Sequence, residues 1–210
     1  MAAAPIEKLD PDAALMLLVT QGDVGAFEQL VEKYKQPVFN IIFRTLPDAT
    51  EAEDLAQNVF VQAYKAAGRY RVTAKFSTWL FTIARNLCLN EIRRRSRHPA
   101  ESMDATLSED EDMPRRQYLD TKCVAPEDAL LRGELFEKVD QAIFELPETQ
   151  RTALLLCREE ELSYEEIAKV LGCSMPATKS LIHRARETLK QKLKPYLRTG
   201  AWSAEKVKQL

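Results

Sequence analysis

Apolar residues recur along most of the chain with the three- and four-residue spacing of amphipathic helices. In the first part of the chain, one such stripe consists of Phe27, Leu30, Val31 and Tyr34. Strict alternation of apolar and polar residues, which marks a half-buried strand, does not extend over any convincing segment. Helices are therefore predicted over 11–20, from 23 to 46 with a kink or brief break at Pro37, over 49–67, and over 76–97.

The second part of the chain returns to the helical pattern after an interruption. Residues 100–125 lack a sustained period and are predicted to form a flexible linker, after which Pro126 begins the next helical unit. Its first apolar face comprises Leu130, Leu131, Leu135, Val139, Ile143 and Phe144, and a further helix is expected over 148–159. The sequence thus predicts an all-α protein with two small helical domains joined by an acidic linker. The predicted divisions are 1–98, 99–125, 126–198 and a tail at 199–210 with no assigned role.

A helix-turn-helix is predicted near the end of the second domain. Ser163 and Glu166 form the capping pattern S-x-x-E at the start of a short helix, and Gly172 supplies the positive φ of a tight turn. The following helix separates an apolar stripe from a basic one. The apolar stripe holds Ile182, Ala185, Leu189 and Leu193, and the basic stripe holds Lys179, His183, Arg186 and Lys190. Such a helix suits a DNA major groove; the alternative is a solvated basic face on an ordinary helical hairpin.

The helix predicted over 76–97 combines aromatic and basic residues near its N-terminal end. The aromatic residues are Tyr70, Phe76 and Trp79, and the neighbouring basic residues are Arg69, Arg71 and Lys75. Unstacked bases lie on aromatic rings while cations meet phosphates, so this mixture fits single-stranded DNA, where stacking contributes roughly 1–3 kcal/mol per base. The alternative is that Phe76 and Trp79 pack in the protein core.

Charge is divided along the chain in a way that the formal net value of −2 conceals. Residues 69–97 carry eight basic side chains and one acidic one, and residues 179–198 carry seven and one. Between them, residues 99–128 hold nine acidic and three basic side chains. This sign asymmetry agrees with two separate helices that contact a polyanion.

Several function classes find little support in the sequence. The N-terminus shows no signal-peptide pattern, and no stretch reaches the roughly 18 apolar residues of a membrane span, so we expect a cytoplasmic protein without membrane insertion. The cysteines at 88, 123, 157 and 173 are scattered, which predicts neither a disulfide framework nor a zinc site. Without a phosphate loop, cofactor motif or nucleophile–base set, we predict no catalytic residue, cofactor or metal. A helix-turn-helix response regulator would need an α/β receiver domain, and this sequence shows no strand pattern to form one. A purely protein-binding adaptor would leave both basic helices unexplained.

Three segments, taken in order, resemble the extracytoplasmic-function group of the bacterial sigma-70 family. They are DLAQNVFVQAY at 54–64, FSTWLFTIARN at 76–86, and LSYEEIA at 162–168 continued through 184–186. The first is similar to the polymerase-binding helix of these factors, the second to their promoter-opening and −10-reading helix, and the third to their −35-reading helix-turn-helix. The resemblance implies a factor that binds core RNA polymerase and directs promoter-specific transcription initiation.

The resemblance also implies roles for individual residues. Contacts with the coiled coil of the largest polymerase subunit are expected from Asp54, Leu55, Gln57, Asn58, Phe60 and Val61. Contacts with the −10 element are expected from Arg69, Tyr70, Lys75, Phe76, Trp79, Asn86, Asn90 and Arg93. The loop at 68–77, together with Asn86, is expected to capture a flipped base. Contacts with the −35 element are expected from Lys179, Ser180, His183, Arg184 and Arg186, within and just after a helix-turn-helix at 164–183.

The implied partners are core RNA polymerase through its β′ coiled coil and β flap, promoter DNA, and an anti-sigma factor that masks both domains. The acidic linker is expected to thread toward the polymerase active site and RNA-exit path, where it would mimic nucleic acid; the alternative is a merely solvated tether. Two departures concern the −35 helix. SMPAT at 174–178 replaces the Pro-Val-Gly-Thr-Val common in the family, and Leu181 stands where a basic residue is common. The preferred −35 sequence therefore stays open.

Overall fold

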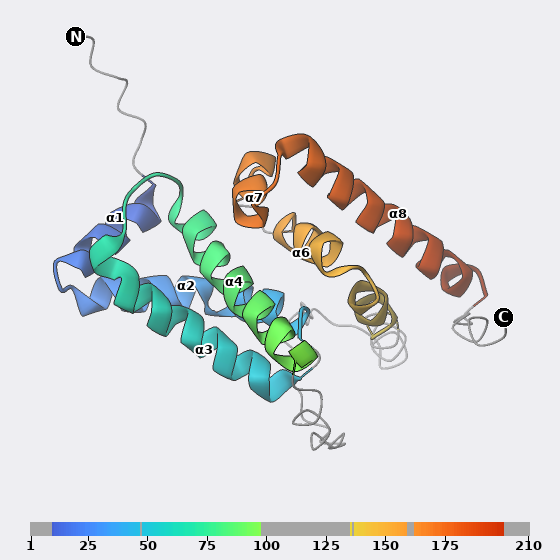
Figure 1. Ribbon diagram of the computed structural model, residues 1–210, viewed down its shortest axis with the longest axis horizontal. Coiled ribbons are helices and arrows are strands. Elements are labelled where there is room, and N and C mark those ends of the chain that lie inside the picture. Colours follow the sequence, from blue (N-terminus) through green and yellow to red (C-terminus); the bar gives the residue numbers. More distant parts are fainter. Residues whose placement is uncertain (1–9, 47, 98–134, 136, 159–161, 200–210) are drawn as a thin grey trace, which may run out of the picture.

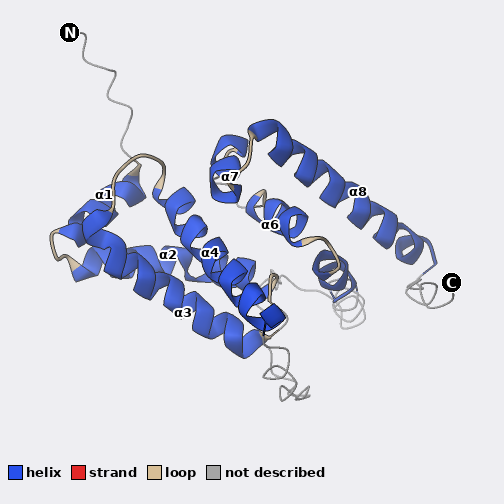
Figure 2. Ribbon diagram, in the orientation of Figure 1, coloured by secondary structure: helices blue, strands red, loops and turns tan. Residues whose placement is uncertain are grey.

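The computed structural model describes residues 10–46, 48–97, 135, 137–158 and 162–199. Within these residues the chain is helical apart from short turns and loops, and it contains no strand (Figure 2). The helices are α1 (Pro11–Thr20), α2 (Val24–Phe43), α3 (Ala49–Ala66), the 3-10 helix η1 (Ala67–Arg69), α4 (Phe76–Arg97), α6 (Glu148–Leu156), α7 (Tyr164–Leu171) and α8 (Met175–Thr199), with a further helical segment at 137–144. The predicted all-α class is confirmed. The predicted linker, the start at Pro126 and the tail beyond Thr199 lie outside the described residues.

Helices α1 to α4 pack together as one unit, coloured blue to green in Figure 1. Helix α2 packs against α1 and α3, and α3 packs against α4. The apolar positions that recur every three or four residues therefore meet in one core. Burial contributes about 1.5–3 kcal/mol for each large aliphatic or aromatic side chain. The most buried side chains of this core include Met16, Leu30, Val38, Ile42, Val59, Phe76 and Leu80.

Local signals set where α2 and α3 begin. The Asp23 carboxylate accepts the backbone N–H of Ala26 at 3.0 Å, and the Asp48 carboxylate accepts that of Glu51 at 3.0 Å. Both satisfy a donor that has no partner within the helix. The possible break at Pro37 does not occur, because α2 runs unbroken through it. Proline removes one helical hydrogen bond, and the packing of α2 between α1 and α3 holds the helix together across that loss.

The second unit contains residues 137–144 and helices α6, α7 and α8. Helix α8 packs along both α6 and α7, and appears as the long red helix in Figure 1. The core of the unit includes Ile143, Leu146, Leu156, Ile167, Ile182 and Ala185. Helix α6 ends at Leu156, earlier than the end predicted at Glu159.

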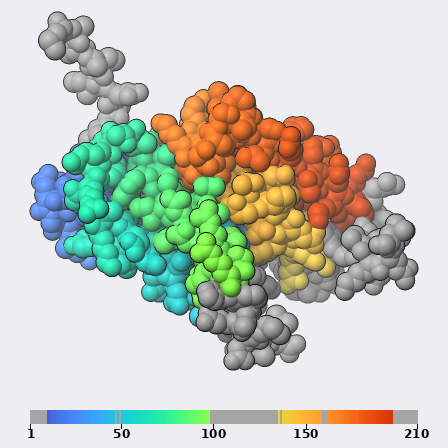
Figure 3. Space-filling model, viewed as in Figure 1, coloured from blue at the N-terminus to red at the C-terminus, as the bar shows by residue number. Residues whose placement is uncertain are grey.

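The two units contact each other where α4 packs against α7 (Figures 1 and 3). Two ion pairs join the units, one at this contact and one between the end of α2 and the segment 137–144. Lys75 Nζ lies 3.3 Å from a Glu166 carboxylate oxygen, and Arg44 Nη2 lies 3.1 Å from Asp140 Oδ1. The start of α4, which is the predicted promoter-opening helix, is thus held beside the first helix of the helix-turn-helix.

Arg151 of α6 adds a third connection between the units. Its guanidinium donates to the carbonyls of Arg44 and Thr45 at the end of α2, at 3.5 and 3.1 Å. It also donates to the carbonyls of Phe144 and Leu146 in its own unit. Burial lowers the pKa of this guanidinium below its ordinary value, although Glu148 opposes the shift. The planar fork satisfies helix-end carbonyls that have no partner within a helix.

Candidate functional site

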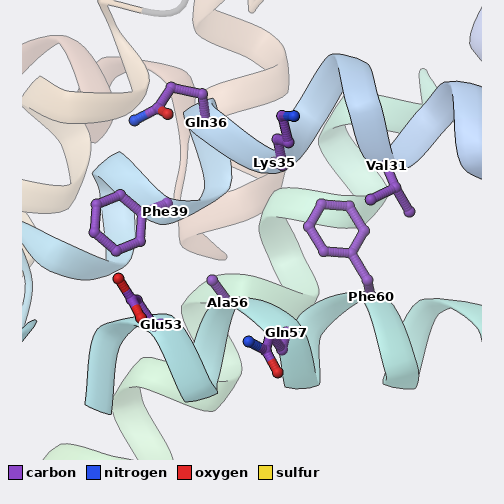
Figure 4. A pocket seen from close by; sticks show the side chains of 8 residues that line it. All are labelled: Val31, Lys35, Gln36, Phe39, Glu53, Ala56, Gln57 and Phe60. Carbon is purple, nitrogen blue, oxygen red and sulfur yellow. The ribbon is translucent and has the colours of Figure 1, made fainter. Parts of the chain in front are cut away.

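An open groove of about 300 Å³ lies between α2 and α3 (Figure 4). It is lined by Val31, Lys35, Gln36, Phe39, Glu53, Ala56, Gln57 and Phe60. The Phe39 ring also stacks on Phe43, with centroids 5.5 Å apart. Apolar surface rimmed by polar and charged side chains is typical of a protein-docking surface.

The residues predicted to contact polymerase divide into three groups. Gln57 and Phe60 line the groove, Asp54 and Val61 are exposed, and Leu55 and Asn58 are partly buried. The sequence-based set missed the α2 side of the groove and Tyr64. Tyr64 is 48% exposed beside Val61 at 47%, and its ring meets Phe27 at 5.0 Å. Phe39 could have indicated the α2 side from the sequence, because this aromatic residue lies outside the apolar stripe of α2 that faces the core.

The aromatic cluster at the start of α4 differs from the prediction. Tyr70 is 3% exposed and Phe76 is 1% exposed, so neither ring is available to stack on a base. Their ring centroids lie 6.3 Å apart, and Trp79 lies 5.0 and 5.8 Å from the two. This burial, with nearby Asp10 and Asp12, raises the pKa of Tyr70 to about 12. The expected contact of Tyr70 and Phe76 with DNA is therefore corrected, because both rings are buried in the hydrophobic core.

The remaining predicted −10 residues reach the surface. Asn86, Asn90 and Arg93 are exposed at i, i+4 and i+7 of α4, which places them on one face of the helix. Arg69 and Lys75 are exposed at the two ends of the preceding loop, and Trp79 is partly buried. Polar side chains therefore follow α4 outward from a loop that carries positive charge.

Acidic side chains engage part of the arginine run at the end of α4. Glu91 accepts from Arg94 at 3.0 Å and from Arg95 at 3.1 Å, and Arg95 also pairs with Glu51 of α3. Arg95 therefore ties α4 to α3, a structural role that the charge count of the sequence does not distinguish from a DNA-facing one.

The helix-turn-helix has the predicted local geometry. Ser163 Oγ accepts the Glu166 N–H at 3.3 Å, and the Glu166 carboxylate accepts the Ser163 N–H at 2.6 Å, which completes the capping box. Hydrogen bonds from Ser163 and the neighbouring Lys75 outweigh burial and lower the pKa of Glu166. Gly172 ends α7 with φ +65° and ψ 34°. Ser174 Oγ accepts the Ala177 N–H at 3.4 Å at the start of α8.

The structure brings all of the predicted −35 residues to the exposed side of α8. They are Lys179, Ser180, His183, Arg184 and Arg186. On the opposite side, Ile182 is 2% exposed and Ala185 is fully buried. Tyr164, which sequence reasoning did not single out, is 38% exposed, and Lys179 Nζ lies 5.8 Å from its ring centroid. Arg186 donates to the thiol of Cys157, the residue that follows α6, at 3.3 Å, so this cation contacts a neighbouring element of the same unit.

Among the described residues no group of three His, Cys, Asp or Glu side chains could hold a metal ion. The described cysteines, Cys88, Cys157 and Cys173, are free thiols, and Cys123 lies outside the described residues. No helix within the described ranges has the length and apolar character to cross a membrane.

Two family models match the chain over its two helical units. The one described as Sigma-70 region 2 matches residues 30–98, and the one described as Sigma-70, region 4 matches residues 136–189. The RNA polymerase sigma-H factor of Pseudomonas aeruginosa is 41% identical over 189 residues, which cover 90% of this chain and 97% of that protein. The ECF RNA polymerase sigma factor SigW of Bacillus subtilis is 36% identical over 176 residues, which cover 84% and 93%.

A solved structure shares the fold over most of the chain. It is that of CnrH in complex with the cytosolic domain of CnrY, with a TM-score of 0.64 and 25% identity. The likeness covers 89% of this chain and 99% of that chain.

Proposed function

This chain belongs to the extracytoplasmic-function group of the sigma-70 family, and from that membership we propose how its surfaces divide the work of promoter-specific transcription initiation. As an RNA polymerase sigma factor, it binds core polymerase and directs it to promoters. We assign polymerase docking to the α2–α3 groove and the exposed face of α3 beside it. Phe60, Gln57 and Val61 are central to this surface, and Phe39 of α2 supplies an aromatic side chain on the opposite wall.

We assign −10 recognition and strand opening to the loop before α4 and to the outer face of that helix. The contacting residues are Arg69, Lys75, Trp79, Asn86, Asn90 and Arg93. Tyr70 and Phe76 support the loop from within the core instead of touching the DNA. Stacking on the partly exposed Trp79 and pairing with an exposed amide would offset the few kcal/mol that unstacking a base costs.

We assign −35 recognition to α8, and one observation carries the proposal. The first turns of α8 present Lys179, Ser180 and His183 to solvent immediately after the left-handed turn at Gly172, with Ile182 buried behind them. In helix-turn-helix proteins, the N-terminal residues of the second helix meet base edges in the major groove. Arg184, Arg186 and Lys190 then follow at positions suited to phosphates.

Several further proposals rest on the family. The domains divide at 98 and 126, the acidic linker between them runs along the polymerase, and the β flap receives the second domain. The chain performs no catalysis of its own and acts in the cytoplasm, on the nucleoid when active. CnrH was solved with the cytosolic domain of CnrY. This supports a protein partner for the present chain, an anti-sigma factor that masks both domains and could hold it at the membrane.

The −10 assignment is tested by Asn86→Ala in reconstituted holoenzyme. Asn86 is exposed, so its truncation costs little stability, and promoter opening measured by permanganate footprinting should fall while affinity for core polymerase stays unchanged. Gln141→Ala removes an exposed amide from the other unit and serves as the control. Equal losses of opening and polymerase affinity for Asn86→Ala would refute the assignment.

The −35 assignment is tested by comparing Lys179→Ala with Lys190→Ala. Both remove one exposed lysine charge from the same helix. Lys179→Ala should change the profile of preferred −35 sequences, with a cost of about 1–3 kcal/mol at the affected base. Lys190→Ala should weaken all sequences alike and reduce the salt dependence of binding. An unchanged sequence profile for Lys179→Ala would count against a base contact.

A further inference from the structure

The first residue of α4 is capped by an acidic side chain from a distant part of the chain. The Asp10 carboxylate accepts the backbone N–H of Phe76 at 2.9 Å, across 66 residues of sequence. A helix's first N–H groups have no partner within the helix, and a side-chain oxygen that satisfies one stabilises the helix end. Asp10 therefore does for α4 what Asp23 and Asp48 do for their own helices.

Asp10 is not engaged in capping the helix that it precedes. It occupies the N-cap position of α1, where its backbone carbonyl accepts the Ala14 N–H at 2.9 Å. Among the described contacts its side chain makes no capping bond to α1. The Asp10 carboxylate is directed to α4 instead. The backbone carbonyl of Asp10 therefore contributes to α1, while its side chain binds the start of α4.

The neighbouring Asp12 holds α1 in the position that this cap requires. It is 6% exposed and accepts hydrogen bonds from Tyr34 Oη and Lys33 Nζ, both at 2.6 Å. The Tyr34 ring packs edge-on against Phe76, with centroids 5.4 Å apart. Asp10 and Asp12 thus fasten α1 to α2 and to the first residue of α4.

These contacts fix both ends of the loop between η1 and α4. Tyr70, at the beginning of the loop, is 3% exposed in the core, and the Phe76 N–H, at its end, is bound to Asp10. Between them the chain returns to the surface, where Val72 is 45% exposed and Lys75 is exposed. The surface part of the loop is therefore suspended between two anchors, one of which belongs to α1.

We propose that Asp10 is a positioning residue for promoter opening, which sets the start of α4 and the geometry of the 70–75 loop without touching DNA. This inference rests on the −10 function proposed above for that loop and helix. It assigns a role to α1, which precedes the residues matched by the region 2 family model. Removal of the cap frees the first turn of α4, and the loop then loses the geometry in which a base is held.

The test uses full-length Asp10→Ala, Asp10→Asn and Asp23→Ala proteins assembled with core polymerase. Promoter opening by permanganate footprinting should fall roughly fivefold for Asp10→Ala, the factor that corresponds to the helix stability usually lost with one N-cap side chain, about 1 kcal/mol. Asp10→Asn should restore opening, because an amide oxygen caps as well as a carboxylate. Asp23→Ala removes an equivalent cap from α2 and should leave opening near the wild-type level, although its urea midpoint falls as much.

The outcomes separate this inference from the proposed function when Asn86→Ala is measured in the same assay. Normal opening by Asp10→Ala together with impaired opening by Asn86→Ala overturns the positioning role alone. Normal opening by both variants overturns the −10 assignment as well. Equal opening defects in Asp10→Ala and Asp23→Ala, or no rescue by Asp10→Asn, would trace the effect to general stability or to charge and would also overturn the proposal.

Discussion

The turn between α7 and α8 depends on one residue in a left-handed conformation. Gly172 has φ +65°, and a methyl group added at its Cα would meet no other atom within 4 Å. Substitution by alanine therefore isolates the backbone cost of the turn from any steric clash.

The expected magnitude follows from two opposing effects. An L-residue in the left-handed region costs about 1–2 kcal/mol relative to glycine. Alanine also restricts the unfolded chain, which offsets about 0.4–1 kcal/mol of that loss. Gly172→Ala should therefore lower the free energy of unfolding by about 1 kcal/mol. Gly172→Asn should lose less, since asparagine enters the left-handed region more readily.

Urea unfolding of the full chain, followed by helical circular dichroism, measures this change. Gly68 is the matched control, because a methyl group there also meets nothing within 4 Å and its φ is not in the left-handed region. Gly68→Ala should be neutral or stabilising by up to about 1 kcal/mol through the unfolded state. Both variants should keep the wild-type dependence on urea, since neither changes the surface exposed on unfolding.

The reasoning fails if Gly172→Ala unfolds at the wild-type urea concentration, or if Gly68→Ala is destabilised to the same extent. The first result would mean that the turn adopts another conformation at little cost. The second would mean that a methyl group at either glycine acts through something other than φ.

Three other perturbations test the packing of the two units. Burial raises the pKa of the Cys88 thiol from 9.0 to about 12, so its thiolate fraction at pH 8 should be about a thousandfold lower than that of an unshifted thiol. Iodoacetamide labelling of the native protein, read by mass spectrometry, should therefore modify Cys157 far sooner than Cys88. Equal labelling rates would contradict this. Arg151→Met should cost about 2–3 kcal/mol of stability, because it leaves helix-end carbonyls without donors. In urea titrations, Arg151→Lys should recover only part of that loss, since lysine lacks the planar guanidinium fork. Full recovery by lysine would show that the fork geometry is unimportant. The lowered pKa of Glu166 adds stability that is present above about pH 4.5 and is lost as the pH falls below that value. Glu166→Gln keeps the cap and loses the Lys75 pair, so it should be less stable than wild type at pH 7 and approach wild type in acid. A stability difference that persists at low pH would refute this.

Much of the helical framework could be predicted because its signals are local. Helix α4 spans the predicted residues, Asp23 caps α2, and the Ser163–Glu166 capping box and the turn at Gly172 have the expected geometry. Each of these features involves groups within four residues of one another, so the amino-acid order alone specifies them. The outward orientation of Lys179 and His183 on α8 follows from the same periodicity, since Ile182 occupies the opposite face.

The choice between alternatives that share one local pattern came only from the tertiary structure. Aromatic residues beside basic ones fit both a stacking surface and a core, and contacts from Tyr34 and α1 place Tyr70 and Phe76 in the core. Asp10 reaches Phe76 across 66 residues and Lys75 reaches Glu166 across 91, distances over which helical periodicity carries no information. The sequence therefore determined which segments are helices and which faces are basic. Long-range packing decided which of those side chains remain available to a partner, because burial depends on neighbours that only folding brings together.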